Sequence, residues 1–160
     1  MSEEDDFLSA LDSDLRAKKD RTDAIDDLFQ MTFSAPEYGE RVSWCLAKMA
    51  QNKCADMRIH SILMSMADSD PEVDENVMWG LGELAATAIG DESSFALIKR
   101  KMTDSNDSVK AMAAWAAGRY RHRLNMTDEE SERILSELLN DSSPLVKASA
   151  EFALSEEEKR

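Results

Sequence analysis

Residues 104–118 read DSNDSVKAMAAWAAG, and this stretch decides the fold because its pattern recurs along the chain. Its first six residues return in altered form as residues 68–73 (Asp-Ser-Asp-Pro-Glu-Val) and 141–146 (Asp-Ser-Ser-Pro-Leu-Val), and an aromatic residue follows each valine by six positions. A weaker copy contains Pro36 and Tyr38. Intervals of 35, 36 and 37 residues separate the four aromatic residues, Trp44, Trp79, Trp115 and Phe152. This period is typical of stacked helix pairs.

Helical periodicity within each repeat predicts two helices, and the short loops between them make the helices antiparallel neighbours. The expected fold is an all-α stack of about four helix pairs. It forms one domain, residues 20–160. The expected pairs are 22–33 with 37–51, 55–67 with 72–89, 94–103 with 108–124, and 128–140 with 145–157. In the first of these helices, Ile25, Leu28 and Phe29 are expected to face inward.

A further amphipathic helix is expected near residues 5–19, in an acidic N-terminal segment assigned to residues 1–19. Apolar residues recur there at helical spacing, at Phe7, Leu8, Leu11 and Leu15. Two roles are open for this helix. It either caps the exposed core of the first repeat or serves as a docking peptide.

Residues at the helix ends support these limits. Thr127 and Glu130 have the spacing of a capping box. Asn52, Gly90 and Asn125 are expected to stop the second helices of the first three repeats, because both residue types tolerate a left-handed backbone.

Composition limits the class of protein. The chain has 160 residues, 42% of them hydrophobic, which is enough for one continuous core. Its net charge of −14 argues against general binding to nucleic acid or to anionic membranes. No apolar run reaches the roughly 18 residues of a membrane-spanning helix, and the acidic start differs from a secretory signal, so we expect a cytoplasmic protein. Cys45 and Cys54 lack zinc or redox spacing and are expected to be reduced thiols.

Residues 90–98 (GDESSFALI), with 104–110 and 113–118 (AAWAAG), resemble one unit of the HEAT-like repeats, in the short form also found in phycobilisome lyase subunits. The resemblance covers about residues 20–158. It implies a right-handed α-α superhelix, an α-solenoid whose second helices line the inner face, and a protein-binding scaffold.

The chain departs from the family pattern in two of the four repeats. The basic residue expected after the valine is present as Lys110 and Lys147, but Asp74 replaces it in the second repeat. The first repeat has neither this basic residue nor the Asp-Ser start.

The second helices carry an apolar stripe at positions four, seven, eight and eleven after Tyr38, Val73, Val109 and Val146. This stripe is the predicted core: Val42, Cys45, Leu46, Met49, Val77, Gly80, Leu81, Leu84, Ala113, Ala116, Ala117, Tyr120, Ala150, Ala153 and Leu154.

The four repeated aromatic residues lie roughly 140° around the helix from the centre of this stripe, so they are expected to form a ladder on the inner flank. In one interpretation, each ring packs against the second helix of the adjoining repeat. In the other, the rings line a partly exposed groove that anchors a partner.

Charged residues accompany this ladder. Glu83 and Arg119 follow Trp79 and Trp115 by four residues and are expected either to orient a bound peptide or to pair with each other. Arg121 and Arg123, together with residues 99–101, make the third repeat basic beside an acidic second repeat. An acidic peptide, a phosphate group or the acidic repeat of a neighbouring molecule would fit this surface, and a solvated charged face is the alternative.

No catalytic residues, metal ligands or cofactor are predicted. His60 and His122 are not followed by glutamate, so the His-Glu pairs of the HEAT-type iron hydroxylases are missing. The sequence also has no Gly-rich phosphate loop or nucleophile elbow. We expect a non-catalytic scaffold or adaptor that binds a segment of another protein on the inner face. The predicted contact residues are Trp44, Trp79, Glu83, Trp115, Arg119, Arg121, Arg123 and Phe152. The alternative is a small HEAT-like enzyme or nucleic-acid repair factor, glycosylase-like or bilin lyase-like, that uses the basic and aromatic groove.

Overall fold

The computed structural model describes residues 2–155, and all regular secondary structure in this range is helical. The helices are α1 (Glu3–Arg16), α2 (Ile25–Ser34), α3 (Gly39–Gln51), α4 (Met57–Met66), α5 (Pro71–Ala85), α6 (Glu92–Lys101), α7 (Asp107–Arg123), α8 (Glu129–Leu138) and α9 (Pro144–Leu154), with 3-10 turns η1 (Thr22–Ala24) and η2 (Pro36–Tyr38). The predicted all-α solenoid is confirmed. The final residues of the predicted repeat domain, 156–160, lie outside the described range, as does the predicted end of the last helix. None of the described helices is both long and apolar enough to cross a membrane.

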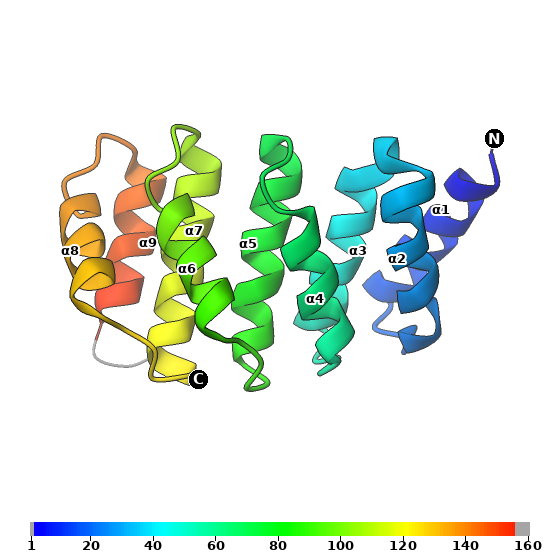
Figure 1. Ribbon diagram of the computed structural model, residues 1–160, viewed down its shortest axis with the longest axis horizontal. Coiled ribbons are helices and arrows are strands. Elements are labelled where there is room, and N and C mark those ends of the chain that lie inside the picture. Colours follow the sequence, from blue (N-terminus) through cyan, green and yellow to red (C-terminus); the bar gives the residue numbers. More distant parts are fainter. Residues whose placement is uncertain (1, 156–160) are drawn as a thin grey trace.

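The helix pairs stack side by side in two layers (Figure 1). Helices α2, α4, α6 and α8 form one layer, and α3, α5, α7 and α9 form the other. The most extensive contacts join α3 to α5, α5 to α7 and α7 to α9. These second helices are therefore the continuous spine of the array, and we call their solvent-facing surface the inner face.

The core lies between the two layers. The predicted stripe of the second helices is buried except for Leu154, which is half-buried at the end of α9. Tyr120 is fully buried, stacks on Phe95 with ring centroids 6.2 Å apart, and donates a 2.7 Å hydrogen bond to Ser94. The inward placement predicted for Phe29 is wrong, because its ring is 42% exposed and Met31 is buried in the same helix instead.

Helix α1 covers the first end of the array. It packs against α3 and buries Leu8, Leu11 and Leu15 almost completely. The Asn52 side chain donates a 2.9 Å hydrogen bond to the carbonyl of Leu15, and Arg41 forms a 2.8 Å ion pair with Asp5. Helix α1 thus occupies the position of a second helix preceding the first repeat, which is the geometry of a cap.

Side-chain caps distinguish the starts of α7 and α9 from that of α3. Asn106 and Ser143 accept hydrogen bonds from backbone amides three residues ahead, which satisfies amides at the start of α7 and α9. The equivalent residue in the first repeat, Ala35, has no side-chain oxygen, and the chain forms the 3-10 turn η2 before α3 begins.

The predicted helix stops are partly wrong. Asn125 does adopt the left-handed backbone, with φ of 54°. Asn52 follows the last residue of α3 as predicted, but Lys53 (φ 73°) adopts the left-handed backbone there. Helix α5 ends at Ala85, well before Gly90, and Ala88 (φ 65°) is the left-handed residue that follows it. A side chain at Gly90 would meet buried rings instead, since an added Cβ would lie 2.8 Å from Cζ of Tyr120.

The capping box before α8 is one residue later than predicted. Asp128 accepts from the amide of Ser131 at 2.7 Å, and the Ser131 hydroxyl accepts from the amide of Asp128 at 3.1 Å. Thr127 and Glu130 are not the box, because α8 begins at Glu129.

Candidate functional site

The four aromatic residues of the ladder lie half-buried along the inner helices α3, α5, α7 and α9. Trp44 and Trp79 contact each other with ring centroids 6.3 Å apart. On its other side, Trp44 is covered by the guanidinium of Arg16, 4.5 Å from the ring centroid. Helix α1 therefore continues the ladder as well as the core.

Two of the aromatic rings pack directly against a glycine of the preceding repeat, and we call these two glycines, Gly82 and Gly118, the glycine seats. A Cβ added at Gly82 would collide with the six-membered ring of Trp115, and one added at Gly118 would lie 2.9 Å from Cε2 of Phe152. Each glycine stands nine residues after its repeat anchor, where the first repeat has Ala47. Small residues at this spacing are the sequence signal that would have indicated packing of the rings between repeats.

Glu83 is the polar centre of the ladder. Its carboxylate accepts a 3.1 Å hydrogen bond from the indole Nε1 of Trp79 and a 3.0 Å hydrogen bond from Arg119. The Arg119 guanidinium also lies over the Trp115 ring, 5.1 Å from its centroid. The two side chains are only 10% and 13% exposed, so this pair links neighbouring repeats from a nearly buried position.

The remaining predicted arginines lie at the end of α7. Arg121 forms a 3.0 Å ion pair with Glu132 and donates to the carbonyls of Ala153 and Ser155 at 3.3 and 3.0 Å. Arg123 is exposed in the last turn of α7. Arg121 thereby ties α7 to both helices of the fourth repeat.

The lysines and arginine at the end of α6 also pair with neighbouring repeats. Lys99 bonds Asp128 at 2.6 Å, and Arg100 bonds Asp68 at 2.7 Å. The basic residues of the third repeat are largely neutralised by acidic residues of the second and fourth repeats in the same chain.

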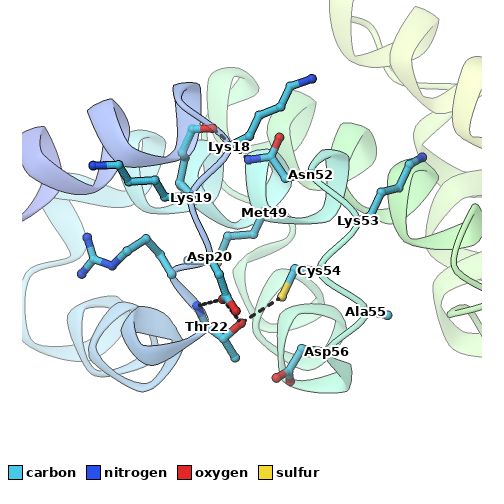
Figure 2. Close-up of a pocket in the computed structure, with 12 residues that line it drawn as sticks. Lys18, Lys19, Asp20, Thr22, Met49, Asn52, Lys53, Cys54, Ala55 and Asp56 are labelled. Carbon is cyan, nitrogen blue, oxygen red and sulfur yellow. Dashed lines mark hydrogen bonds between the residues drawn. The ribbon is translucent and has the colours of Figure 1, made fainter.

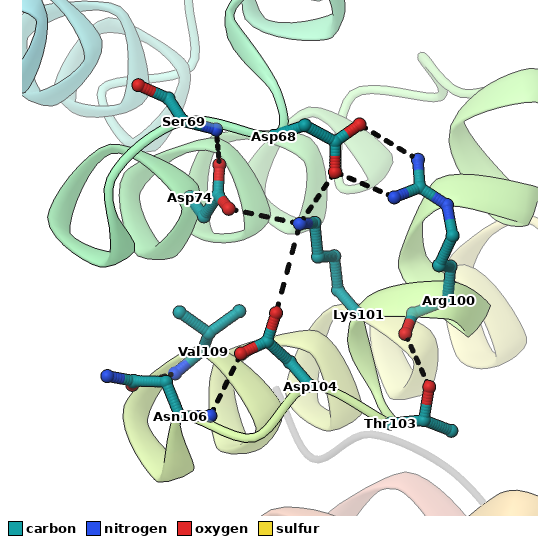
Figure 3. A network of polar contacts seen from close by, with 9 residues as sticks. All are labelled: Asp68, Ser69, Asp74, Arg100, Lys101, Thr103, Asp104, Asn106 and Val109. Carbon is teal, nitrogen blue, oxygen red and sulfur yellow. Dashed lines mark hydrogen bonds and ion pairs between the residues drawn. The ribbon is translucent and has the colours of Figure 1, made fainter.

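Lys101 is the most enclosed member of this network (Figure 3). Its ammonium group lies 2.8 Å from Asp68, 3.0 Å from Asp74 and 3.8 Å from Asp104. Burial alone would lower the pKa of Lys101, but the hydrogen bonds to the two nearer carboxylates raise it. These contacts explain why the second repeat has Asp74 where the family pattern has a basic residue, because a lysine from the next repeat balances its charge.

An open hollow of about 410 Å³ lies on the inner face between α5, α7 and α9. Its lining is mainly apolar and includes the rings of Trp79 and Trp115. Leu145, at the start of α9, is 57% exposed at its edge. The other lining residues are Glu75, Ser108, Ala111, Met112 and Ser149. We call this feature the tryptophan hollow.

A second hollow adjoins it and shares Glu75. It lies among α1, α3 and α5 and is more polar. Trp44 and Arg16 line it, together with the carboxylates of Glu40 and Glu72. We call it the acidic hollow. Of the predicted contact residues, these two hollows bring together the three tryptophans, whereas Glu83, Arg119, Arg121, Arg123 and Phe152 lie outside their linings.

The hollow at the end of α1 is polar (Figure 2). Asp20 accepts from the amide and hydroxyl of Thr22, and that hydroxyl lies 3.6 Å from Sγ of Cys54. Figure 2 shows the ammonium groups of Lys18 and Lys53 directed away from these atoms. The hollow therefore does not gather its cations around a common point, as an anion site would.

The histidines and cysteines are dispersed. Within residues 2–155, no group of three or more His, Cys, Asp or Glu residues is placed to hold a metal ion. His60 is buried, and burial lowers its pKa. Burial likewise raises the pKa of Cys45 to about 12, so this thiol is unreactive near neutral pH.

Comparison with known proteins gives one match. A family profile described as HEAT repeats matches residues 59–155, which is more than half of the chain. No curated protein and no solved structure matches.

Proposed function

Because the chain belongs to the HEAT-repeat family, we propose that it is a non-catalytic scaffold whose inner face binds a segment of another protein. The observation that carries this proposal is the tryptophan hollow with the exposed side chain of Leu145 beside it. Tryptophan is enriched among the anchor residues of protein interfaces, and exposed apolar surface such as that of Leu145 beside it marks interaction sites.

In this proposal, Trp79 and Trp115 supply the floor of the site and the Glu83–Arg119 pair holds the two rings in place. Trp44 extends the same surface into the acidic hollow. Direct contacts from Arg121, Arg123 and Phe152 stay predictions. A cytoplasmic location belongs to the same proposal and is supported by the free thiols of Cys45 and Cys54.

The pairing of the basic residues favours a scaffold over the repair-factor alternative. An enzyme that grips a phosphate backbone needs cations free to replace counterions. Lys99, Arg100 and Arg121 instead bond carboxylates of neighbouring repeats.

Selection from a random peptide library displayed on phage, with the full chain immobilised, tests the proposal. Peptides that bind the wild type are expected to lose at least tenfold in affinity on Leu145→Glu. Leu145 is exposed, so this change should leave the unfolding transition unchanged. Met57→Glu is the matched control, because Met57 is 62% exposed on α4 in the other layer. Failure to select peptides, or equal binding to wild type and Leu145→Glu, would overturn the proposal.

A further inference from the structure

Glutamate side chains extend along the inner face from the tryptophan hollow into the acidic hollow. Glu72, Glu75 and Trp79 follow one another at spacings of three and four residues, so they lie along one face of α5. Glu40, on α3, lines the acidic hollow together with the two glutamates. The apolar anchor site thus continues directly into a row of carboxylates.

These three carboxylates differ from most others in the array. None of them forms an ion pair or accepts a hydrogen bond from another residue within the described range 2–155. Arg16 and Arg41 also line the acidic hollow, but each already pairs with an aspartate, Arg16 with Asp12 and Arg41 with Asp5. Because these three carboxylates lie in one hollow and have no ion pair of their own in the described range, cations from outside the chain would gain favourable contacts with them.

Resting on the proposed function, we infer that the bound segment is cationic. It places an apolar side chain in the tryptophan hollow and lysine or arginine side chains in the acidic hollow, against Glu40, Glu72 and Glu75. The net charge of −14 adds long-range attraction for such a segment. An acidic segment would meet repulsion at this site and would find the cations of the third repeat already paired.

The peptides selected on the wild-type protein supply the test. We expect them to carry net positive charge and at least one large apolar residue. Their affinity should fall at least tenfold in the triple variant Glu40→Gln, Glu72→Gln, Glu75→Gln, and it should weaken as salt is raised. The matched control is Glu3→Gln, Glu92→Gln, Glu129→Gln, which removes three exposed glutamates from the first turns of α1, α6 and α8 and should change affinity less than twofold.

A modified peptide tests whether the positive charge of the bound segment contributes to binding. Replacing every lysine and arginine of a selected peptide by glutamine should cause the same loss on the wild type and little further loss on the Glu40, Glu72, Glu75 triple variant.

The outcomes separate the two proposals. Neutral or acidic peptides that bind the triple variant normally, yet are lost on Leu145→Glu, would overturn the cationic inference and leave the inner-face proposal standing. Binding that ignores Leu145→Glu, or no selected peptide at all, would overturn both.

Discussion

The Glu83 carboxylate on α5 accepts a 3.0 Å hydrogen bond from the Arg119 guanidinium on α7, one repeat further along the chain. The same carboxylate bonds the indole of Trp79, and the same guanidinium lies over the ring of Trp115. One ion pair therefore fixes two aromatic rings, and its loss should loosen the junction between the second and third repeats.

A double-mutant cycle tests this coupling. Glu83→Gln keeps an acceptor for Trp79 but removes the charge that faces Arg119, and Arg119→Met removes the partner. Each change should cost about 2 kcal/mol in the free energy of unfolding, because it removes a charge-assisted hydrogen bond between two nearly buried side chains. In urea titrations, the loss of unfolding free energy in the double variant should be smaller than the sum of the two single losses by at least about 0.5 kcal/mol. Additive costs would show that the two residues act separately.

A glycine-to-alanine substitution should change the stability in opposite directions at a glycine seat and at a glycine with open space around it. Gly118→Ala should destabilise by about 1–3 kcal/mol, because the new Cβ would lie 2.7 Å from Cα of Ala153, which is backbone. Gly39→Ala is the matched control in α3. Its Cβ would lie 3.5 Å from Val73, an ordinary contact, so the higher helix propensity of alanine should stabilise slightly, by less than about 1 kcal/mol because Gly39 is the first residue of α3. Melting temperatures of the two variants should move in opposite directions, and a shared sign would contradict the packing argument.

The buried lysine should matter more than its half-buried counterpart. Lys101→Met leaves the buried carboxylate of Asp74 without its cation and should cost about 3 kcal/mol. Lys110→Met breaks the more accessible 3.0 Å pair with Asp141 and should cost about 1 kcal/mol. Chemical unfolding of both variants checks the order, and equal costs would argue against the enclosed network.

Lowering the pH should weaken the ion pairs that Asp68 forms with Arg100 and Lys101. Hydrogen bonds from Arg100, then Lys101, lower the pKa of Asp68 to about 2, from an ordinary value of 3.8. Because the folded value is the lower one, this stabilisation is complete above about pH 4 and is lost as the pH falls toward 2. Unfolding free energies measured from pH 5 to pH 2 should therefore fall more steeply for the wild type than for Asp68→Asn.

Asparagine suits this comparison because Asp68 has φ of 64°, which asparagine also tolerates. Parallel curves for the two proteins would mean that Asp68 titrates without this shift.

The sequence was sufficient for the architecture because the fold depends on local period. The apolar stripe of each second helix follows from residues within one repeat, and the spacing of Trp44, Trp79 and Trp115 shows that the same unit recurs. Contacts between repeats were harder to predict. Asp74 departs from the family pattern, and the reason lies in the next repeat, where Lys101, 27 residues away, donates a hydrogen bond to it.

The candidate site was predicted in part. Its aromatic residues were correctly placed outside the core of each pair, but the seat of Trp115 on Gly82 depends on how two helices from different repeats approach each other. Leu145 was missed because a single exposed leucine at a helix start carries no periodic signal. The left-handed residues after α3 and α5, Lys53 and Ala88, were missed because neither residue type favours the backbone conformation that it adopts.

The ion pairs between repeats also give the array a fixed order. At the junction of the second and third repeats, the earlier repeat supplies the acid, Asp74, and the later one the lysine at the end of α6. At the junction of the third and fourth repeats the order is reversed, because Lys110 precedes Asp141. If the third repeat were deleted, Leu138 would stand in the place of Lys101, and Asp74 would face Asp141 without a cation. Although the repeats share one pattern, they are not interchangeable parts, and a rearranged chain would join like charges at its new junction.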